Sequence, residues 1–191
     1  MRKSFSNIII SKPAIVFDLD DTLVYATLLQ PNDLDNKHFF TIIYNRRKLY
    51  VQTRPNLKYF LERISKLYDI YFYTSSTKEY ANLIIDKIMP DIKQNHRFFR
   101  DSCINVYGYY VKDLNLIRRP LKQILLVDDS SGSALKNPKN LVKIEPWQGE
   151  KDDKVLLNLL GVLENIALES DIRSSFLEIV KNEKLEGINT F

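Results

Sequence analysis

The chain has 191 residues, of which 45% are hydrophobic and 27% are charged. These values lie near the averages of globular proteins, so they exclude a disordered or fibrous chain and predict one well-buried core. No run of about 18 apolar residues is present, so no membrane-spanning helix is expected. The single cysteine, Cys103, excludes an internal disulfide framework and predicts a reducing compartment.

The net charge is +4 and the isoelectric point is near 9.0. A mild basic excess favours acidic partners, such as phosphopeptides or nucleic acid, through electrostatic steering. The densest basic cluster is only 46–48, which a solvated turn explains equally well, so direct nucleic-acid binding is not predicted. The apolar stretch 8–10 is too short for a secretory signal. We therefore expect an intracellular soluble protein.

The first predicted element is a strand over 14–17, an apolar run that ends at Asp18. Residues 38–52 have strand-like composition on both sides of a polar centre, which predicts a hairpin. Apolar residues then recur at helical spacing over 57–67, so a helix is expected there, with Pro55 in its first turn.

The middle of the chain continues the alternation. Its predicted elements are a strand over 70–73, a helix over 80–88, a hairpin over 103–111 and a strand over 124–127. Ser76, followed by Glu79 three residues later, fits a capping box at the start of that helix, and Pro90 ends it. Gly108 is expected at the turn of the hairpin.

Two further helices are predicted near the C-terminus, over 155–166 and over 172–180. Strands that alternate with helices predict a doubly wound α/β fold with a mainly parallel sheet and flanking helices. The first hairpin is then a small insertion, and no large cap domain is expected. We expect a single domain over 1–191, with a core over about 13–170 and a C-terminal helix over about 170–185.

Acidic residues follow two of the buried strands, at the edge of such a sheet where ligands bind. Asp18 and Asp20 would bring two like charges together, which is costly without a cation. Mg²⁺ prefers oxygen ligands and keeps waters that a phosphate can replace. The second pair, after the strand over 124–127, supplies Asp129 as a further ligand and Asp128 as a group that orients Lys112 or metal-bound water.

The first acidic motif is suited to phosphoryl transfer. Asp18 can attack phosphorus and form an aspartyl-phosphate. Asp20 can protonate the departing alkoxide and then deprotonate the water that hydrolyses the intermediate. Thr22 is expected to brace the loop by hydrogen bonding. For this hexapeptide alone, a solvated acidic turn after a strand remains the alternative.

Candidate phosphate-binding residues follow the predicted strand over 70–73 and the predicted hairpin over 103–111. The hydroxyls of Thr74 and Ser75, with free amides at a helix entrance, suit phosphate oxygens, although ordinary N-capping is the alternative. Lys112 would bring a compact positive charge to a phosphoryl group, but its position alone does not distinguish it from a solvated lysine.

The order of these elements resembles the haloacid dehalogenase superfamily, and especially the FCP/SCP-type phosphatases that act on the C-terminal domain of RNA polymerase II. The resemblance spans most of residues 14–170. The matching segments are Asp18-Leu19-Asp20-Asp21-Thr22-Leu23-Val24, Arg54-Pro55, Tyr73-Thr74-Ser75, Lys78-Glu79-Tyr80-Ala81, Phe99-Arg100-Asp101-Ser102-Cys103, Tyr110-Val111-Lys112-Asp113-Leu114 and Val127-Asp128-Asp129-Ser130.

The resemblance implies a magnesium-dependent protein serine/threonine phosphatase. The implied roles are Asp18 as nucleophile and metal ligand, Asp20 as general acid/base with its backbone carbonyl on the metal, Thr74 and Lys112 on the phosphoryl group, Asp129 in the magnesium shell, and Tyr80 and Arg100 on the peptide substrate. The sequence departs from the family at Asp129, where the small phosphatases usually carry asparagine, and the extra charge is expected to tighten metal binding.

The expected substrate is a phosphorylated protein or peptide, with the C-terminal domain of RNA polymerase II as the leading candidate. Little chain separates Asp18 from Thr74 beyond one hairpin and one helix, so a lid that encloses a small metabolite is not expected. We expect a nuclear, monomeric enzyme without a membrane partner. Two alternatives stay open: an inactive peptide-binding relative, and a phosphatase acting on a small molecule or a nucleic-acid end.

Overall fold

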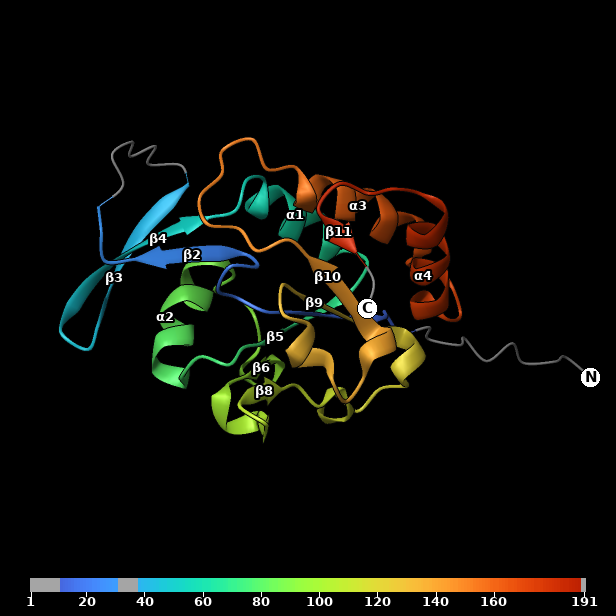
Figure 1. The fold of residues 1–191 in the computed structure, drawn as a ribbon, viewed down its shortest axis with the longest axis horizontal. Helices are drawn as coiled ribbons and strands as arrows, with labels where there is room; N and C mark the ends of the chain where they lie inside the picture. The colour runs from blue at the N-terminus through green and yellow to red at the C-terminus, as the bar shows by residue number, and fades with distance from the viewer. Residues whose placement is uncertain (1–10, 31–37, 190–191) are drawn as a thin grey trace, which may run out of the picture.

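The computed structural model describes residues 11–30 and 38–189 (Figure 1). At its centre, β1 (Ala14–Phe17) lies between β5 (Asp69–Tyr73) and β9 (Ile124–Asp128), and both neighbours are parallel to it. The outer strands of this six-stranded sheet are β6 (Arg97–Phe98), β10 (Leu141–Ile144) and β11 (Ile188–Asn189). Only β11 runs antiparallel to its neighbour. The three predicted buried strands are confirmed.

The central strands are apolar throughout because both of their faces are buried. In β1, Ile15 and Phe17 belong to the larger of two core clusters, whereas Ala14 and Val16 belong to the smaller one on the other face. A strand covered on both sides needs such a continuous apolar run, because each alternate residue meets a packed layer.

The α-helices all contribute to the larger core cluster. They are α1 (Leu57–Ile64), α2 (Lys78–Ile88), α3 (Val155–Ile166) and α4 (Ile172–Asn182). In Figure 1, α1 and α3 lie side by side and α4 follows α3. None of the helices in the described part of the chain is both long and apolar enough to cross a membrane.

Two details of the predicted helix starts are wrong. The N-cap of α1 is Asn56, so Pro55 lies outside the helix. The N-cap of α2 is Thr77, whose hydroxyl accepts a hydrogen bond from the Tyr80 amide, so the expected capping box at Ser76 does not form. The Ser76 hydroxyl instead donates to the Asp20 carboxylate.

Short 3₁₀-helices cover the other face of the sheet. Leu114, Ile117 and Ala134 of these helices are buried in the smaller cluster. The hairpin of β7 (Ile104–Val106) and β8 (Tyr109–Val111) also lies here, with Gly108 in its turn at φ 88°, as predicted. This side is therefore built from turns and a hairpin rather than from longer helices.

A second, three-stranded sheet follows the first acidic motif. It consists of β2 (Val24–Thr27), β4 (Arg47–Thr53) and β3 (Phe39–Tyr44), in that order and all antiparallel. Asn45 and Arg46 have positive φ, as a tight two-residue hairpin turn requires. The sheet projects from one end of the molecule (Figure 1). The predicted α/β class and hairpin insertion are confirmed, and the described residues contain no large cap domain.

A buried guanidinium connects the first acidic motif to the C-terminal part of the fold. Arg54, 1% exposed, pairs with both carboxylate oxygens of Asp153, at 2.9 and 2.7 Å. It also donates to the backbone carbonyls of Thr22 and Glu145, each at 3.1 Å. These bonds hold the loop after β1 against the end of β10 and the start of α3.

Asp153→Asn leaves the Arg54 guanidinium buried without its counter-charge. We expect the free energy of unfolding to fall by about 3–5 kcal/mol, measured by urea titration with circular dichroism. The matched control is Glu164→Gln, which neutralises the solvent-exposed Arg63–Glu164 pair and is expected to change the midpoint little. Equal losses in the two variants would contradict the role assigned to Arg54.

Candidate active site

The register of the parallel sheet brings the candidate residues to one edge. Phe17 of β1 pairs with Phe72 on one side and with Val127 on the other. The residue after Phe17 is Asp18 and the residue after Val127 is Asp128, so these two side chains emerge next to each other. The Asp18 amide donates to the Val127 carbonyl at 3.0 Å, which extends the pairing into the site.

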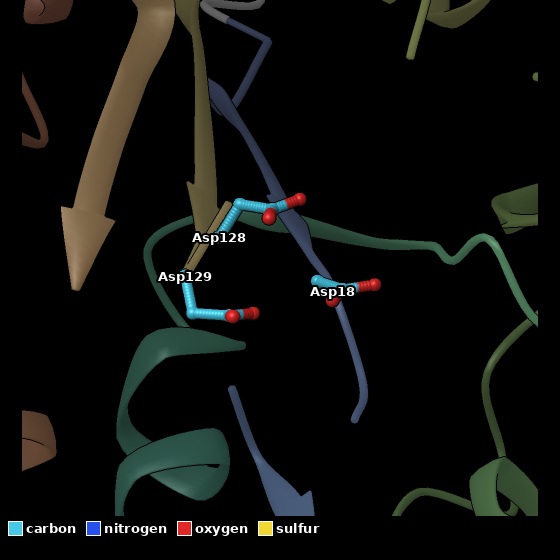
Figure 2. A group of neighbouring side chains, drawn as sticks. All are labelled: Asp18, Asp128 and Asp129. Atoms are coloured by element: carbon cyan, nitrogen blue, oxygen red, sulfur yellow. The ribbon is translucent and has the colours of Figure 1, made fainter. Parts of the chain in front are cut away.

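Three carboxylates meet at this edge, as Figure 2 shows. Each of Asp18, Asp128 and Asp129 offers an oxygen, and these oxygens all lie within 4.8 Å of one another. Asp18 and Asp128 are buried and Asp129 is half-buried. The residues come from β1 and β9, more than a hundred positions apart in the chain, and the fold alone brings them together.

One buried ammonium group balances part of this charge. Lys112 Nζ lies 2.8 Å from Asp18 Oδ1 and 2.5 Å from Asp128 Oδ2, and the side chain is 2% exposed. Burial alone would lower the pKa of Lys112, but Asp128 and Asp18 outweigh it and raise the pKa above its ordinary value. The other oxygen of Asp128 accepts from the Ser130 amide at 2.8 Å, so both of its oxygens are engaged.

The remaining negative charge fits a divalent cation. Burial raises the pKa of Asp18 to about 7 although Lys112 opposes the rise, and burial with Asp128 also raises the pKa of Asp129. Asp18 Oδ1 forms an ion pair with Lys112 but no hydrogen bond of acceptable geometry with the described residues. Only one ammonium group balances the three carboxylates, and carboxylate oxygens are the hard donors that Mg²⁺ prefers.

Thr22 links the first acidic motif to Asp129. Its hydroxyl donates to Asp129 Oδ1 at 3.1 Å and accepts from the Asp129 amide at 3.2 Å. Arg54 also donates a hydrogen bond to the Thr22 carbonyl, so both the backbone and the side chain of Thr22 are held in place. This is the bracing contact expected of Thr22, and it sets the direction of the Asp129 carboxylate.

A pocket of about 220 Å³ opens over Asp18 and Lys112. Its other lining residues are Ser75, Asp128, Ser130, Ser133 and the hairpin residues Gly108, Tyr109 and Tyr110. A Cβ at Gly132 would lie 2.2 Å from Cδ1 of Tyr109, so the tyrosine ring uses the space left by the missing side chain. Thr74 is buried and not among the lining residues; its hydroxyl accepts from the Ser76 amide at 3.0 Å.

Asp20 opens onto a neighbouring pocket of about 300 Å³ and not onto the carboxylate cluster. Tyr80 and Arg100, the predicted substrate contacts, both line this second pocket. Arg100 Nε donates to the Ser75 carbonyl at 2.7 Å, and its guanidinium lies 5.2 Å from the centre of the Tyr110 ring. Arg100 of the second pocket thus contacts Ser75, which lines the first.

Sequence patterns missed the contact of Ser76 in the Asp20 pocket. Ser76 was expected only as a helix cap, but its hydroxyl donates to Asp20. Tyr44 belongs to the aromatic hairpin, for whose rings sheet packing was the default and an apolar pocket beside the site was the alternative; it lines this pocket. No local pattern marks the Ser76 contact, because Ser76 and Asp20 lie 56 positions apart in the chain.

The parallel sheet described above is a fold shared with a solved phosphatase structure. The solved structure of Fcp1, an essential RNA polymerase II CTD phosphatase, matches with a TM-score of 0.59 at 19% sequence identity, over 91% of this chain and 54% of that one. The family model described as NLI interacting factor-like phosphatase matches residues 13–173. The chain belongs to this family, and the resemblance to FCP/SCP-type phosphatases is confirmed.

Two curated relatives support the same family membership. The CTD small phosphatase-like protein 2 of Dictyostelium discoideum is 34% identical over 165 residues, which cover 85% of this chain and 29% of that protein. The phosphatase PSR1 of Saccharomyces cerevisiae is 31% identical over 161 residues, which cover 84% and 38%. The chain thus spans about a third of the length of these two relatives.

Lys112→Met tests the balance of charge in the site. The change leaves Asp18 and Asp128 buried without a counter-charge, and we expect the free energy of unfolding to fall by about 3–5 kcal/mol. In the double variant Lys112→Met/Asp128→Asn the loss should be smaller than the sum of the single losses by about 1–3 kcal/mol. Urea unfolding of the four proteins in metal-free buffer gives this coupling. Additive losses would contradict the pairing.

Proposed function

We propose that the protein is a magnesium-dependent phosphatase of phosphoserine and phosphothreonine side chains in proteins. The observation that carries the proposal is Asp18, whose carboxylate lies beside the buried Lys112 and within reach of Asp128 and Asp129. Attack by a carboxylate on a phosphate ester requires positive charge that offsets the charge of the phosphoryl oxygens. Lys112 supplies part of this charge at the end of β1, and a divalent cation held by the carboxylates would supply the rest.

In the proposed reaction the two acids have separate roles. The Asp18 carboxylate attacks phosphorus, the bond from phosphorus to the serine oxygen breaks, and Asp20 gives its proton to that oxygen. Asp20 then takes a proton from water, the resulting hydroxide attacks the aspartyl-phosphate, and inorganic phosphate leaves with Asp18 restored. We assign Lys112 and Ser75, which line the pocket over Asp18, to the phosphoryl oxygens, and Thr74, whose hydroxyl accepts from the Ser76 amide, to the support of this loop.

Asp18, Asp129 and the backbone carbonyl of Asp20 are the groups that we assign to Mg²⁺, with Asp128 orienting Lys112. When bound, the ion supplies positive charge that keeps Asp18 ionised and offsets the charge of the phosphate. Asp129 adds a full negative charge to this donor set, which supports tight binding. Thr22 holds that carboxylate in place.

A phosphoprotein is the substrate class that the site supports best. The described residues provide no cap domain over either pocket to enclose a metabolite. Fcp1 acts on the CTD of RNA polymerase II and the Dictyostelium relative is named for it, so phosphorylated CTD repeats are our leading candidate. A nuclear location follows from this proposal.

Two isosteric substitutions test the division of labour between the acids. Asp18→Asn should abolish turnover of p-nitrophenyl phosphate, because an amide does not form the phosphoryl-enzyme. Asp20→Asn should lower kcat on a phosphoserine peptide by about 100-fold or more and affect p-nitrophenyl phosphate far less, since nitrophenolate leaves without a proton. Steady-state kinetics on both substrates measure this, and full activity in Asp18→Asn would end the proposal.

A substrate panel separates the proposed function from its competitors. Purified protein is assayed for phosphate release from phosphoserine CTD peptides, sugar phosphates and 3′-phosphorylated DNA, with Mg²⁺ and with EDTA. We expect release from the phosphopeptides only, and only with Mg²⁺. Preference for the sugar phosphates or the DNA end would replace the substrate class, and binding of the peptides without turnover would favour an inactive relative.

A further inference from the structure

Asp20 is held at both of its carboxylate oxygens by hydroxyl groups from one short segment. The Tyr80 hydroxyl donates to Oδ1 at 2.6 Å, and the Ser76 hydroxyl donates to Oδ2 at 2.8 Å. A tyrosine hydroxyl is neutral at physiological pH and can donate only one proton. With a separate donor on each oxygen, the carboxyl plane of Asp20 is fixed against rotation about its terminal torsion.

Tyr80 is itself fixed by its surroundings. Its amide donates to the Thr77 hydroxyl at 3.5 Å at the start of α2. Its ring packs edge-to-face against Tyr44 of the insertion sheet, with the ring centres 5.3 Å apart. The Tyr44 hydroxyl in turn meets the Thr77 hydroxyl at 3.0 Å. The tyrosine therefore cannot swing away from Asp20 without breaking contacts on two elements.

A general acid depends strongly on its direction, because the proton must lie on the line to the leaving oxygen when the bond breaks. Asp20 lies on the loop between β1 and β2, where its carboxyl group needs partners that restrict its direction. The two hydroxyls supply that restriction. Tyr80 makes the shorter of the two hydrogen bonds and lies within α2, whereas Ser76 precedes that helix.

We propose that Tyr80 is a positioning residue that aims the proton of Asp20 at the leaving oxygen, with Ser76 as the second support. The inference rests on the proposed phosphatase function. It gives Tyr80 a part in the chemical step in addition to the peptide contact expected from the family resemblance. It also connects the insertion sheet, through Tyr44, to the acid that protonates the leaving group.

The test is the dependence of rate on the leaving group in Tyr80→Phe, a change that removes only the hydroxyl. Substituted phenyl phosphates, from p-nitrophenyl to p-methoxyphenyl, are used because they lack a peptide and depend increasingly on the acid. We expect kcat/KM to fall less than about 2-fold on p-nitrophenyl phosphate and about 10-fold or more on the poorest leaving group, a fraction of the usual contribution of a general acid.

A double variant shows whether Tyr80 acts through Asp20. In Asp20→Asn, which lacks the acid, adding Tyr80→Phe should change kcat/KM less than about 2-fold on every phenyl phosphate, because coupled residues do not lose their effects twice. Ser76→Ala should steepen the leaving-group dependence in the same direction as Tyr80→Phe. It also serves as the second variant if Tyr80→Phe folds poorly.

The matched control is Tyr68→Phe, which removes another buried tyrosine hydroxyl, one that donates to the Leu163 carbonyl at 2.7 Å away from the site. This variant should be less stable but keep the wild-type leaving-group dependence. An equal loss on all phenyl phosphates in Tyr80→Phe, or a rise only in KM for phosphopeptides, would overturn the positioning role. Wild-type protein without turnover of any phosphate ester would instead overturn the proposed function.

Discussion

The buried Lys112 between Asp18 and Asp128 is the interaction on which the site depends. Two carboxylates that leave adjacent parallel strands repel each other, and burial makes that repulsion stronger. A single ammonium 2.8 and 2.5 Å from them allows both strands to end at the same place. The residual negative charge with Asp129 then provides a reason for a cation to bind. Fold stability and chemistry thus share the same three side chains.

Different elements around this centre position the two acidic residues Asp18 and Asp20. The Arg54–Asp153 pair fixes the loop that carries the first acidic motif. Thr22 of that loop donates a hydrogen bond to Asp129 and so holds its carboxylate as well. The insertion sheet acts on the other acid, since Tyr44 supports Tyr80 and Tyr80 holds Asp20. In the proposed mechanism the nucleophile is therefore positioned by the central sheet and the acid by the insertion. This division follows from the two pockets onto which the acids open.

The sequence predicted the parts of this arrangement that have a local pattern. The buried strands and the acids that follow them were found because continuous apolar runs end at Asp18 and Asp128. The strands β6 and β11 have two residues each, and Lys143 interrupts the apolar run of β10, so these gave no signal. Lys112 became a candidate through family resemblance, since a lysine after a hairpin has no periodic signature. The bonds from Ser76 and Tyr80 to Asp20 join positions 56 and 60 apart, a relation that only the folded chain provides.

The close approach of Tyr109 to Gly132 has a consequence for the shape of the pocket over Asp18 and Lys112. The tyrosine ring forms one of its walls by resting on the backbone of the loop that follows the second acidic pair. Any residue larger than glycine at position 132 would push that ring outward and widen the opening. The absence of a side chain at Gly132 thus lets the Tyr109 ring lie close to this loop and narrows the pocket that it lines.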